Sequence, residues 1–561
     1  MIPVHLRITR TSRRRTCLPR EWRTTRRSTA SGASSPAVRP TKSGLEAKRK
    51  RFPIVLSGEV SQAKDAQHAG RRRHPRGLAT LAMTEMWERF SLCGTVAILV
   101  HFLSASASHG GMGLAEGTSE AVEGVYLAMI ALLALPGGWI ADRLLGARRA
   151  VLWGGLVIMA GHLSLAVPGR AFVWPGLALI AIGTGLLKAN ISTMVGRLYA
   201  REDDQRRDAG YALFYMGINV GAVIAPLVVG YLGEEVNWHL GFGAAAVGMA
   251  FGLAQYVIGG RKVPALRDEP VDQLTPAERR KLVRGVAYGL TGAGILFGTL
   301  VLLHACSIDN VTFLLTVLAV AVPAGYIFSM LRSPKITAAE RIRFKGYIWL
   351  FVAAALFWAV YVQIGNELNL FAAKKTDLSL FGWRMPASWT QSLPYLFVIL
   401  LAPLFASFWV RRGRRMSTPL KFAVALILAG ISFVVMSAAS SIASGGVRVS
   451  LMWLVGVYVI QVTGEMCLSP VGLSVTPKLA PKAYANQMMG VWLLAMASGQ
   501  AIGGQLPRLA HSVMSQSANF LWQGGLLVVA GATMSLFTRR LKQQMGENPP
   551  AAGAAPLTAA A

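Results

Sequence analysis

The strongest constraint on this chain is a series of long apolar segments that recur from residue 77 to residue 540. A helix that crosses the hydrocarbon core of a bilayer needs about 20 mostly apolar residues. Lipid offers no partner for backbone N–H and C=O groups, so each such segment must be helical. The chain is therefore predicted to be an all-α polytopic membrane protein. Its fourteen predicted spans are 78–103, 120–141, 150–168, 172–196, 209–232, 240–260, 284–304, 311–331, 346–371, 389–410, 419–439, 449–473, 485–506 and 518–538.

The composition agrees with this class. Hydrophobic residues make up 53% of the chain and charged residues only 15%, whereas soluble domains contain about 25% charged residues. The formal net charge is +31. A soluble enzyme, a disulfide scaffold and a fully disordered chain are disfavoured, which leaves a membrane protein or an unusually apolar nucleic-acid binder. The cysteines (Cys17, Cys93, Cys306 and Cys467) lack CxxC spacing, so neither a disulfide framework nor a metal site is expected.

Half of the excess charge lies in the first 76 residues, which hold 20 Lys and Arg against four acids. Such a segment cannot bury enough apolar surface to fold alone, so residues 1–76 are predicted to be a basic disordered tail. A membrane-surface or nucleic-acid arm, an organellar transit peptide and a mis-assigned start remain alternatives. The next methionine after Met1 is Met83, which already lies in an apolar segment. Residues 541–561 are likewise expected to be a disordered tail.

Lys and Arg in the loops predict the orientation, because cytoplasmic loops carry an excess of them. With the N-terminal tail in the cytoplasm, 28 Lys and Arg fall on the cytoplasmic side and six on the opposite side. We therefore expect a multi-pass protein of the cytoplasmic (inner) membrane with both termini in the cytoplasm. The positive charge of the loops is then explained by the orientation of the protein in the membrane, and no nucleic-acid partner is expected.

Two predicted cytoplasmic turns resemble each other. GGWIADRLLGARR follows the second span at 137–149, and FWVRRGRR ends the tenth span at 408–415. Each turn places a glycine between basic residues. Gly137 and Gly138 are expected to let neighbouring helices approach closely.

These turns suggest an internal repeat. If the spans at 284–304 and 311–331 are an insertion, twelve spans remain in two halves of six, each with its basic turn between its second and third helices. Parallel halves of this kind are typical of major facilitator transporters. The predicted organisation is a six-helix bundle at 77–260, a cytoplasmic linker with two inserted helices at 261–345, and a second six-helix bundle at 346–540.

Ionisable residues inside the spans are costly, so each is a candidate functional group. Glu85, Glu88 and Arg89 lie in the first span at a spacing that puts them on one helical face. Two carboxylates and one guanidinium leave one carboxylate underpaired. Such a group suits proton uptake, and hence proton-coupled transport. A structural ion pair near the helix end is the alternative interpretation.

Lys188 lies midway through the fourth span, with no acid near it in the sequence. It must find a partner on another helix, with Glu85, Glu88 and Glu465 as candidates, or give up its proton. Glu465 is the only acid in its own span. If Lys188 and Glu465 face a central cavity near the midplane, they suit a zwitterion with separated ends, such as a short peptide. A gate formed by the two residues is equally compatible with the sequence.

Eight sequence motifs lie along nearly the whole of 77–540. They are ExxERF at 85–90, GGWIADRLLG at 137–146, GTGLLKANIS at 183–192, RRDAGYALFYMGINVGAVIAPLVVGYLGE at 206–234, FWAVYVQ at 357–363, LLAPLFASFW at 400–409, GEMCLSPVGLS at 464–474 and MMGVWLLA at 488–495. In this order they resemble the proton-dependent oligopeptide transporter family, also called the peptide transporter family, a branch of the major facilitator superfamily. The resemblance implies proton-driven uptake of di- and tripeptides by alternating access. It also implies two extra helices between the halves.

The resemblance assigns roles to individual residues. Glu85, Glu88 and Arg89 match the proton-coupling motif. Lys188 matches the lysine tied to coupling and to the peptide carboxylate, and Glu465 the acid that meets the peptide amine or pairs with that lysine. The remaining substrate-binding candidates are Tyr126, Asn219, Trp358 and Trp492, which fall at family pocket positions, and Gln363, which is amphipathic enough to line the pocket.

The departures from the family pattern concentrate in the predicted pocket. Leu92 and Cys93 stand where the family has two tyrosines, and Val96 where an arginine follows. Val362 replaces a glutamate, and Pro394 and Tyr395 replace the asparagine and the proline of a QSxNP motif. The polar groups lost are of the kind that bind peptide termini, peptide backbone or a coupled proton. Substrate identity and proton stoichiometry therefore stay open.

The resulting hypothesis is a monomeric proton-coupled symporter, without cofactor or enzymatic activity. Its expected partners are a small peptide or a related amine- or carboxylate-bearing solute, protons and the lipid bilayer. A proton-coupled exporter of the same superfamily is one alternative. A non-transporting membrane sensor that keeps the fold is another, and the missing pocket groups motivate it.

Overall fold

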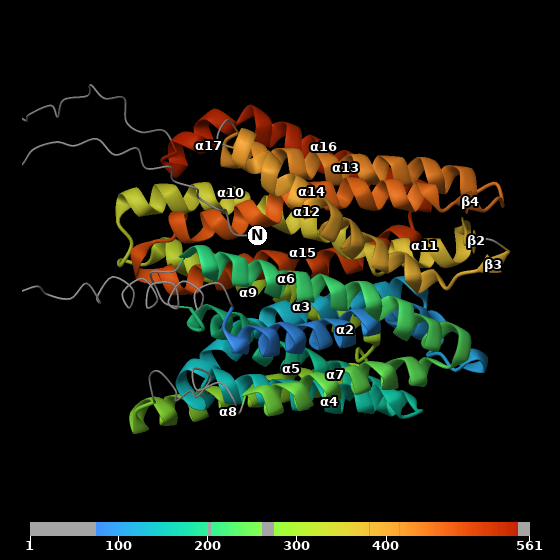
Figure 1. Ribbon diagram of the computed structural model, residues 1–561, viewed down its shortest axis with the longest axis horizontal. Coiled ribbons are helices and arrows are strands. Elements are labelled where there is room, and N and C mark those ends of the chain that lie inside the picture. Colours follow the sequence, from blue (N-terminus) through green and yellow to red (C-terminus); the bar gives the residue numbers. More distant parts are fainter. Residues whose placement is uncertain (1–73, 200–203, 261–273, 381, 414–415, 548–561) are drawn as a thin grey trace, which may run out of the picture. The chain divides into compact units, whose positions relative to one another are not determined.

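The computed structural model describes residues 74–199, 204–260, 274–380, 382–413 and 416–547. Most of the predicted N-terminal tail and Cys17 lie outside this range. Helices make up almost all of the described chain, as the apolar segments predict. Figure 1 shows α13, α14 and α16 side by side, and α4 beside α5 and α7.

The first half consists of six long helices with short extensions. The long helices are α2 (Arg76–Ser104), α3 (Glu116–Ile140), α4 (Ala147–Ala166), α5 (Arg170–Arg197), α6 (Asp204–Ala225) and α7 (Trp238–Gly260). The π-helical turn η2 (Ala141–Leu145) continues α3, the π-helical turns η3 (Pro226–Gly230) and η4 (Leu232–Val236) continue α6, and η1 (Ala107–His109) follows α2. Two helices, α8 (Pro276–Leu302) and α9 (Ile308–Arg332), separate this half from the next.

The second half begins with a broken helix. Its elements are α10 (Ala338–Tyr361), η6 (Val362–Ile364), α11 (Glu367–Lys375), η7 (Ala387–Gln391), α12 (Ser392–Arg412), α13 (Thr418–Ala443), α14 (Met452–Leu479), η9 (Lys482–Gln487), α15 (Met488–His511), α16 (Gln516–Leu536) and α17 (Thr538–Met545). Two small sheets lie in its loops. Strand β1 (Thr376–Asp377) pairs in parallel with β4 (Val449–Ser450), and β2 (Ser379–Leu380) pairs antiparallel with β3 (Trp383–Arg384).

Twelve described helical segments are long and apolar enough to cross a membrane. The α16–α17 pair, bent by 63°, makes a thirteenth if it is counted as one span. The remaining predicted span, 485–506, corresponds to α15, which is not among them. Because α15 packs on α3, α9 and α10, much of its surface meets protein rather than lipid, so it needs fewer apolar residues. The fourteen predicted spans are thus compatible with the helices, and hydropathy alone supports twelve or thirteen.

Each half has its own apolar core. One cluster of buried side chains comes from α2 to α7, and another from α10 to α17 together with the end of α9. The halves meet chiefly where α3 packs against α15 and α6 packs against α12, with smaller contacts of α2 with α11 and η7 and of η3 with η7. These helices flank any site between the halves.

Contacts between distant loops agree with the predicted alternation of sides. Arg508 Nη1 lies 3.2 Å from Asp309 Oδ1, and both residues belong to loops predicted on the outer side. The backbone N–H of Lys482 donates to Glu340 Oε1 at 3.0 Å, and both belong to loops predicted on the cytoplasmic side.

The C-terminal tail begins later than the sequence indicated. Residues 541–545, assigned above to a disordered tail, continue helix α17. Leu541 and Met545 are buried, and their spacing of four places both on one helical face. This face packs against α10 and α13, which explains why the segment is ordered despite its polar composition. Residues 548–561 lie outside the described range.

Gly137 and Gly138 of the first basic turn have different environments. A Cβ added to Gly137 would overlap the carbonyl group of Gly185 on α5, because the two helices approach backbone to backbone there. A Cβ added to Gly138 would meet only the Cβ of Ala189, at an ordinary contact distance of 3.6 Å. The close approach predicted for both glycines is therefore made by Gly137.

This difference gives a matched test of helix packing. Gly137→Ala is expected to lower the free energy of unfolding by about 1–3 kcal/mol, the usual cost of overpacking a well-packed interface. Gly138→Ala is expected to change it by less than about 0.5 kcal/mol, as for ordinary surface substitutions. Unfolding of the two purified variants in detergent, followed by circular dichroism, measures both. Equal stability of the two variants would contradict the assignment.

Candidate functional site

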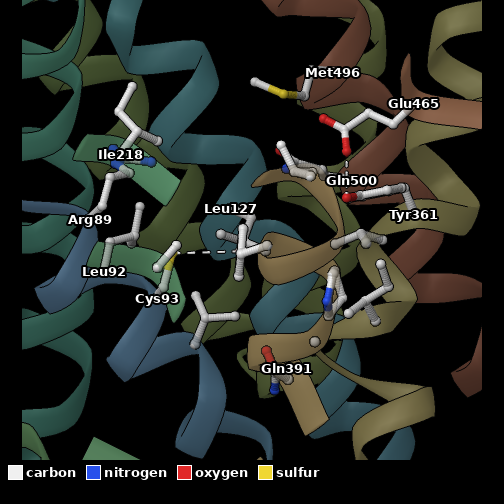
Figure 2. Close-up of a pocket in the computed structure, with 18 of the residues that line it drawn as sticks. Arg89, Leu92, Cys93, Leu127, Ile218, Tyr361, Gln391, Glu465, Met496 and Gln500 are labelled. Carbon is white, nitrogen blue, oxygen red and sulfur yellow. Dashed lines mark hydrogen bonds between the residues drawn. The ribbon is translucent and has the colours of Figure 1, made fainter. Parts of the chain in front are cut away.

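A cavity of about 260 Å³ lies between the two halves. Its lining comes from α2, α3, α5 and α6 of the first half and from α10, α12, α14 and α15 of the second. The charged residues of the lining are Arg89, Lys188 and Glu465. Figure 2 shows Arg89 and Glu465 on opposite sides of the cavity. The two cations belong to the first half and the acid to the second.

The three charged residues of the first span form a local ion-pair cluster on α2. Arg89 donates from Nε and Nη2 to the two carboxylate oxygens of Glu88, at 2.5 and 2.7 Å. Glu85 Oε1 lies farther from Arg89 Nε, at 3.7 Å. The second oxygen of Glu85 is buried without a hydrogen-bond partner among the described residues. Glu88 therefore holds the guanidinium group, and Glu85 is the underpaired carboxyl group of the cluster.

Lys188 reaches the cavity from α5. Its side chain forms no ion pair with Glu85, Glu88 or Glu465 within the described part of the chain. It does interact electrostatically, over a longer range, with the Glu85–Glu88–Arg89 cluster. The ammonium group is thus available to a ligand in the cavity.

Glu465 faces the cavity from α14 and is bound to a tyrosine of the same half. The hydroxyl of Tyr361 on α10 donates to Glu465 Oε2 at 2.6 Å, as the dashed line in Figure 2 shows. This hydrogen bond fixes the orientation of the carboxylate. Because a carboxylate accepts several hydrogen bonds, Glu465 keeps capacity for a cationic ligand group.

The other predicted binding residues fall into two groups. Asn219 and Trp358 line the cavity, whereas Tyr126, Gln363 and Trp492 are buried behind it. The hydroxyl of Tyr126 has no hydrogen-bond partner among the described residues. The structure thus brings Arg89, Lys188, Asn219, Trp358 and Glu465 together at one cavity.

Two of the buried residues have partners inside the second half. Gln363 donates from Nε2 to Gln523 Oε1 at 2.5 Å. The ring of Trp492 packs edge-on against Phe422, with ring centroids 6.2 Å apart, and fills the space beside Gly472. Both side chains therefore support the second half from behind the cavity wall.

All six positions that depart from the family pattern line this cavity: Leu92, Cys93, Val96, Val362, Pro394 and Tyr395. Four of the six side chains carry no hydrogen-bonding group. The exceptions are bonded to each other, because Cys93 donates from its thiol to the hydroxyl of Tyr395 at 3.5 Å. The departures therefore make part of the cavity wall apolar.

The structure adds polar residues that the sequence reasoning did not identify. These are Tyr215, Tyr361, Gln391 and Gln500. Helical spacing offered a clue for two of them, because Tyr361 follows Trp358 by three positions and Tyr215 precedes Asn219 by four. Gln391 is the first residue of the QSxNP-like segment and precedes Pro394 by three positions. Gln500 stands near no predicted residue at such a spacing, so only the tertiary structure places Gln500 at the cavity.

Hydrogen bonds join the two halves near the loops predicted on the outer side. Glu234 of η4 accepts the backbone N–H groups of Ala387 and Ser388 at 2.9 and 2.8 Å, and so caps the start of η7. The hydroxyl of Ser392 donates to the carbonyl oxygen of Val223 at 2.7 Å. These contacts hold the first half against η7 and α12.

Comparisons with known proteins agree with one another in sequence and in fold. The model of the POT family matches residues 148–523. The chain is 38% identical to a di-/tripeptide transporter of Lactococcus lactis subsp. cremoris, over 84% of this chain and 97% of that protein. It is 40% identical to a Bacillus subtilis (strain 168) protein named uncharacterized transporter YclF, over 84% of this chain and 95% of that protein.

Solved structures show the corresponding similarity in three dimensions. A crystal structure of the peptide transporter POT in complex with sulfate matches with a TM-score of 0.80 and 45% identity, covering 84% of this chain and 96% of that one. A POT family transporter in complex with 5-aminolevulinic acid matches with a TM-score of 0.79 and 37% identity, covering 83% and 97%. The chain therefore belongs to the POT family of membrane transporters.

Proposed function

We propose that this chain is a proton-coupled symporter that imports di- or tripeptides, or a related small solute with an amine and a carboxylate, by alternating access. The observation that carries the proposal is one cavity between the halves, with Lys188 on one side and Glu465 on the other. Similarity to di-/tripeptide transporters over most of the chain supports the same substrate class.

The charge arrangement matches a zwitterion. The Lys188 ammonium has no ion-pair partner among the described residues and suits the substrate carboxylate. Glu465, oriented by Tyr361, suits the substrate amine. The cavity volume of about 260 Å³ favours a small solute, because pockets for larger, drug-sized ligands start at about 300 Å³. Leu92, Val96 and Val362 favour apolar substrate side chains between the two ends.

Charge balance provides a coupling mechanism. Two carboxyl groups, Glu85 and Glu88, lie close to two cations, Arg89 and Lys188. When all four are ionised, their charges cancel. A proton bound to either carboxyl group leaves one net positive charge beside the cavity, which strengthens the attraction for the substrate carboxylate. Release of that proton on the other side of the membrane weakens the attraction and favours substrate release.

The proposed location is the cytoplasmic (inner) membrane, with both termini in the cytoplasm and a monomer as the transporting unit. The loop charge supports this orientation, with 28 Lys and Arg on the proposed cytoplasmic side against six on the other. The hydrogen bonds of Glu234 and Ser392 then close the outer side of the cavity. Opening that side requires these contacts to break.

Uptake into proteoliposomes tests this function. An inward proton gradient is expected to drive labelled dialanine above its equilibrium level, and a protonophore to abolish the accumulation. Liposomes without protein provide the control. Accumulation of another solute but not of dialanine would exclude the peptide assignment. Uptake that does not depend on the proton gradient would exclude the coupling of transport to protons. Binding of dialanine without any transport would favour the sensor alternative.

A further inference from the structure

A second buried acid, Glu123, lies outside the cluster described above. It is on α3 and has no exposed surface. Neither of its carboxyl oxygens has a hydrogen-bond partner among the described residues. A buried ionised carboxylate without partners is very costly, and far more so than a neutral carboxyl group. The structure therefore fits Glu123 in its protonated form.

The carboxyl group of Glu123 packs against the point where the first helix of the second half breaks. Helix α10 ends at Tyr361, η6 makes one further turn, and α11 begins at Glu367. Gly365 lies in this break and also lines the central cavity. A Cβ at Gly365 would overlap Glu123 Oε1, so the glycine leaves the space that this carboxyl group occupies. Glu123 thus contacts the cavity wall from behind, across the boundary between the halves.

Other buried polar groups around the break also lack partners. Among the described residues, unpartnered atoms include Gln363 Oε1, Asn366 Nδ2 and Asn369 Oδ1 on the broken helix, and Glu120 Oε2 on α3. Buried polar atoms are normally bonded to protein or to ordered water. Several such atoms on the broken helix and on α3 leave hydrogen-bonding capacity that suits water molecules and a mobile proton.

A row of carboxyl groups links this site to the outer end of α3. Glu116, Glu120 and Glu123 are spaced by four and three residues, which places them on one helical face. Glu116 is partly exposed and pairs with Lys374 on α11. Glu120 is 1% exposed and Glu123 is fully buried. The row therefore leads from solvent at the proposed outer side to the wall of the cavity.

The charged neighbours do not neutralise Glu123. On the elements packed around it, the titratable groups include Glu116, Glu120 and Tyr126 on α3, Glu85, Glu88, Arg89, Cys93 and His101 on α2, Lys188 on α5, Asp309 on α9, Glu367, Lys374 and Lys375 on α11, and Arg508 and His511 on α15. Three of the cations already have anionic partners: Arg89 binds Glu88, Lys374 binds Glu116, and Arg508 binds Asp309. No described cation forms an ion pair with Glu123.

We propose that Glu123 is a proton-binding site of this transporter, loaded when the halves separate at the outer side and holding its proton while they are joined there. On separation, a proton passes from the outer solution by way of Glu116, water and the Glu120 carboxylate, and an O–H bond forms on Glu123. That O–H bond breaks when water reaches Glu123 from the cavity beside Gly365, and the water carries the proton toward the cytoplasm. Its role in coupling rests on the proposed symport, whereas proton binding by Glu123 does not.

Infrared difference spectroscopy on the reconstituted full chain tests the site without any substrate. Raising the pH is expected to remove a protonated-carboxyl band that is absent from Glu123→Gln and shifted in Glu123→Asp. Glu116→Gln, the same change two turns away at a partly exposed position, is expected to keep the band. If the Glu123→Gln spectrum keeps every protonated-carboxyl band of the wild type, the proposal is overturned. If Glu123→Gln does not fold, the band shift in Glu123→Asp decides.

Transport measurements test the coupling role of Glu123. Gradient-driven dialanine uptake by Glu123→Gln is expected to fall about tenfold, within the 5–150-fold range typical of coupled binding sites. Exchange of labelled for unlabelled dialanine without a gradient is expected to stay near wild type. Glu235→Gln, the same change at an exposed glutamate of η4 outside this row, is expected to retain both activities. Unchanged gradient-driven uptake by Glu123→Gln overturns the coupling role. If wild-type protein transports no dialanine, the symport proposal fails, and the infrared band alone decides the proton site.

Discussion

Replacing Lys188 with alanine is expected to abolish the accumulation of dialanine that an inward proton gradient drives. The wild-type ammonium group faces the cavity without an ion-pair partner among the described residues, beside the Glu85–Glu88–Arg89 cluster. Its removal takes away the binding site proposed for the substrate carboxylate and the charge that proton binding is proposed to modulate. Truncating one partner of a buried charge pair costs about 2–5 kcal/mol, which corresponds to a loss of about 30-fold or more. Uptake of labelled dialanine into proteoliposomes, with and without the gradient, measures the effect.

Lys421 offers a matched control for this substitution. It is a lysine at the edge of an apolar span, its ammonium group lies over the ring of Trp409, 4.6 Å from the centroid, and it does not line the cavity. Lys421→Ala is expected to keep gradient-driven uptake within about twofold of wild type, since exposed cation–π contacts contribute only about 0.5–1 kcal/mol. Equal losses in the two variants would show that Lys188 has no specific role in transport.

The second large effect is expected at Glu465. Glu465→Gln keeps the size of the side chain and its hydrogen bond with Tyr361, but removes the negative charge that is proposed to bind the substrate amine. A hydrogen bond to a charged group contributes about 1.5–3 kcal/mol, so the affinity for dialanine is expected to fall about 10- to 150-fold. Competition against labelled substrate, at a pH where the amine is protonated, measures this affinity.

A blocked substrate separates loss of the amine contact from general damage to the cavity. N-acetyl-dialanine lacks the cationic amine, so its affinity is expected to be weak for the wild type and nearly unchanged by Glu465→Gln. Tyr361→Phe removes only the hydroxyl that orients the carboxylate, and it is expected to give a smaller loss for dialanine. A parallel fall in affinity for the blocked and free peptides would contradict the amine-binding role.

Much of the fold follows from the sequence because lipid imposes a simple requirement. Every backbone polar group in the hydrocarbon layer must be satisfied within its own segment, so apolar length alone indicates helices. Segment 485–506 is helical as predicted, in α15, although its hydropathy falls short of that of the other spans. The break after Tyr361 was not predicted, because FWAVYVQIGNELNL contains no proline and reads as one continuous apolar helix.

The candidate site was accessible from the sequence only in part. Charged residues in apolar segments stand out because of their cost, which is why Arg89, Lys188 and Glu465 were identified. Tyrosines and glutamines do not stand out, since they are tolerated both at helix interfaces and at cavity walls. Gln500 therefore emerged only from the structure, and Trp492 and Gln363, which the sequence assigned to the pocket, lie behind its wall.

The sequence by itself determined the class of protein, the approximate helices and the few charges inside them, because these depend on local composition and on the energetics of the bilayer. Only the tertiary structure decided which of those charges meet. Helix packing brought Lys188 and Glu465 to one cavity, from positions 277 residues apart in the sequence. The same packing placed the carboxyl group of Glu123 against the glycine of a broken helix in the other half. Such contacts depend on how whole helices pack across the boundary between the halves, and no local pattern in the chain records that packing.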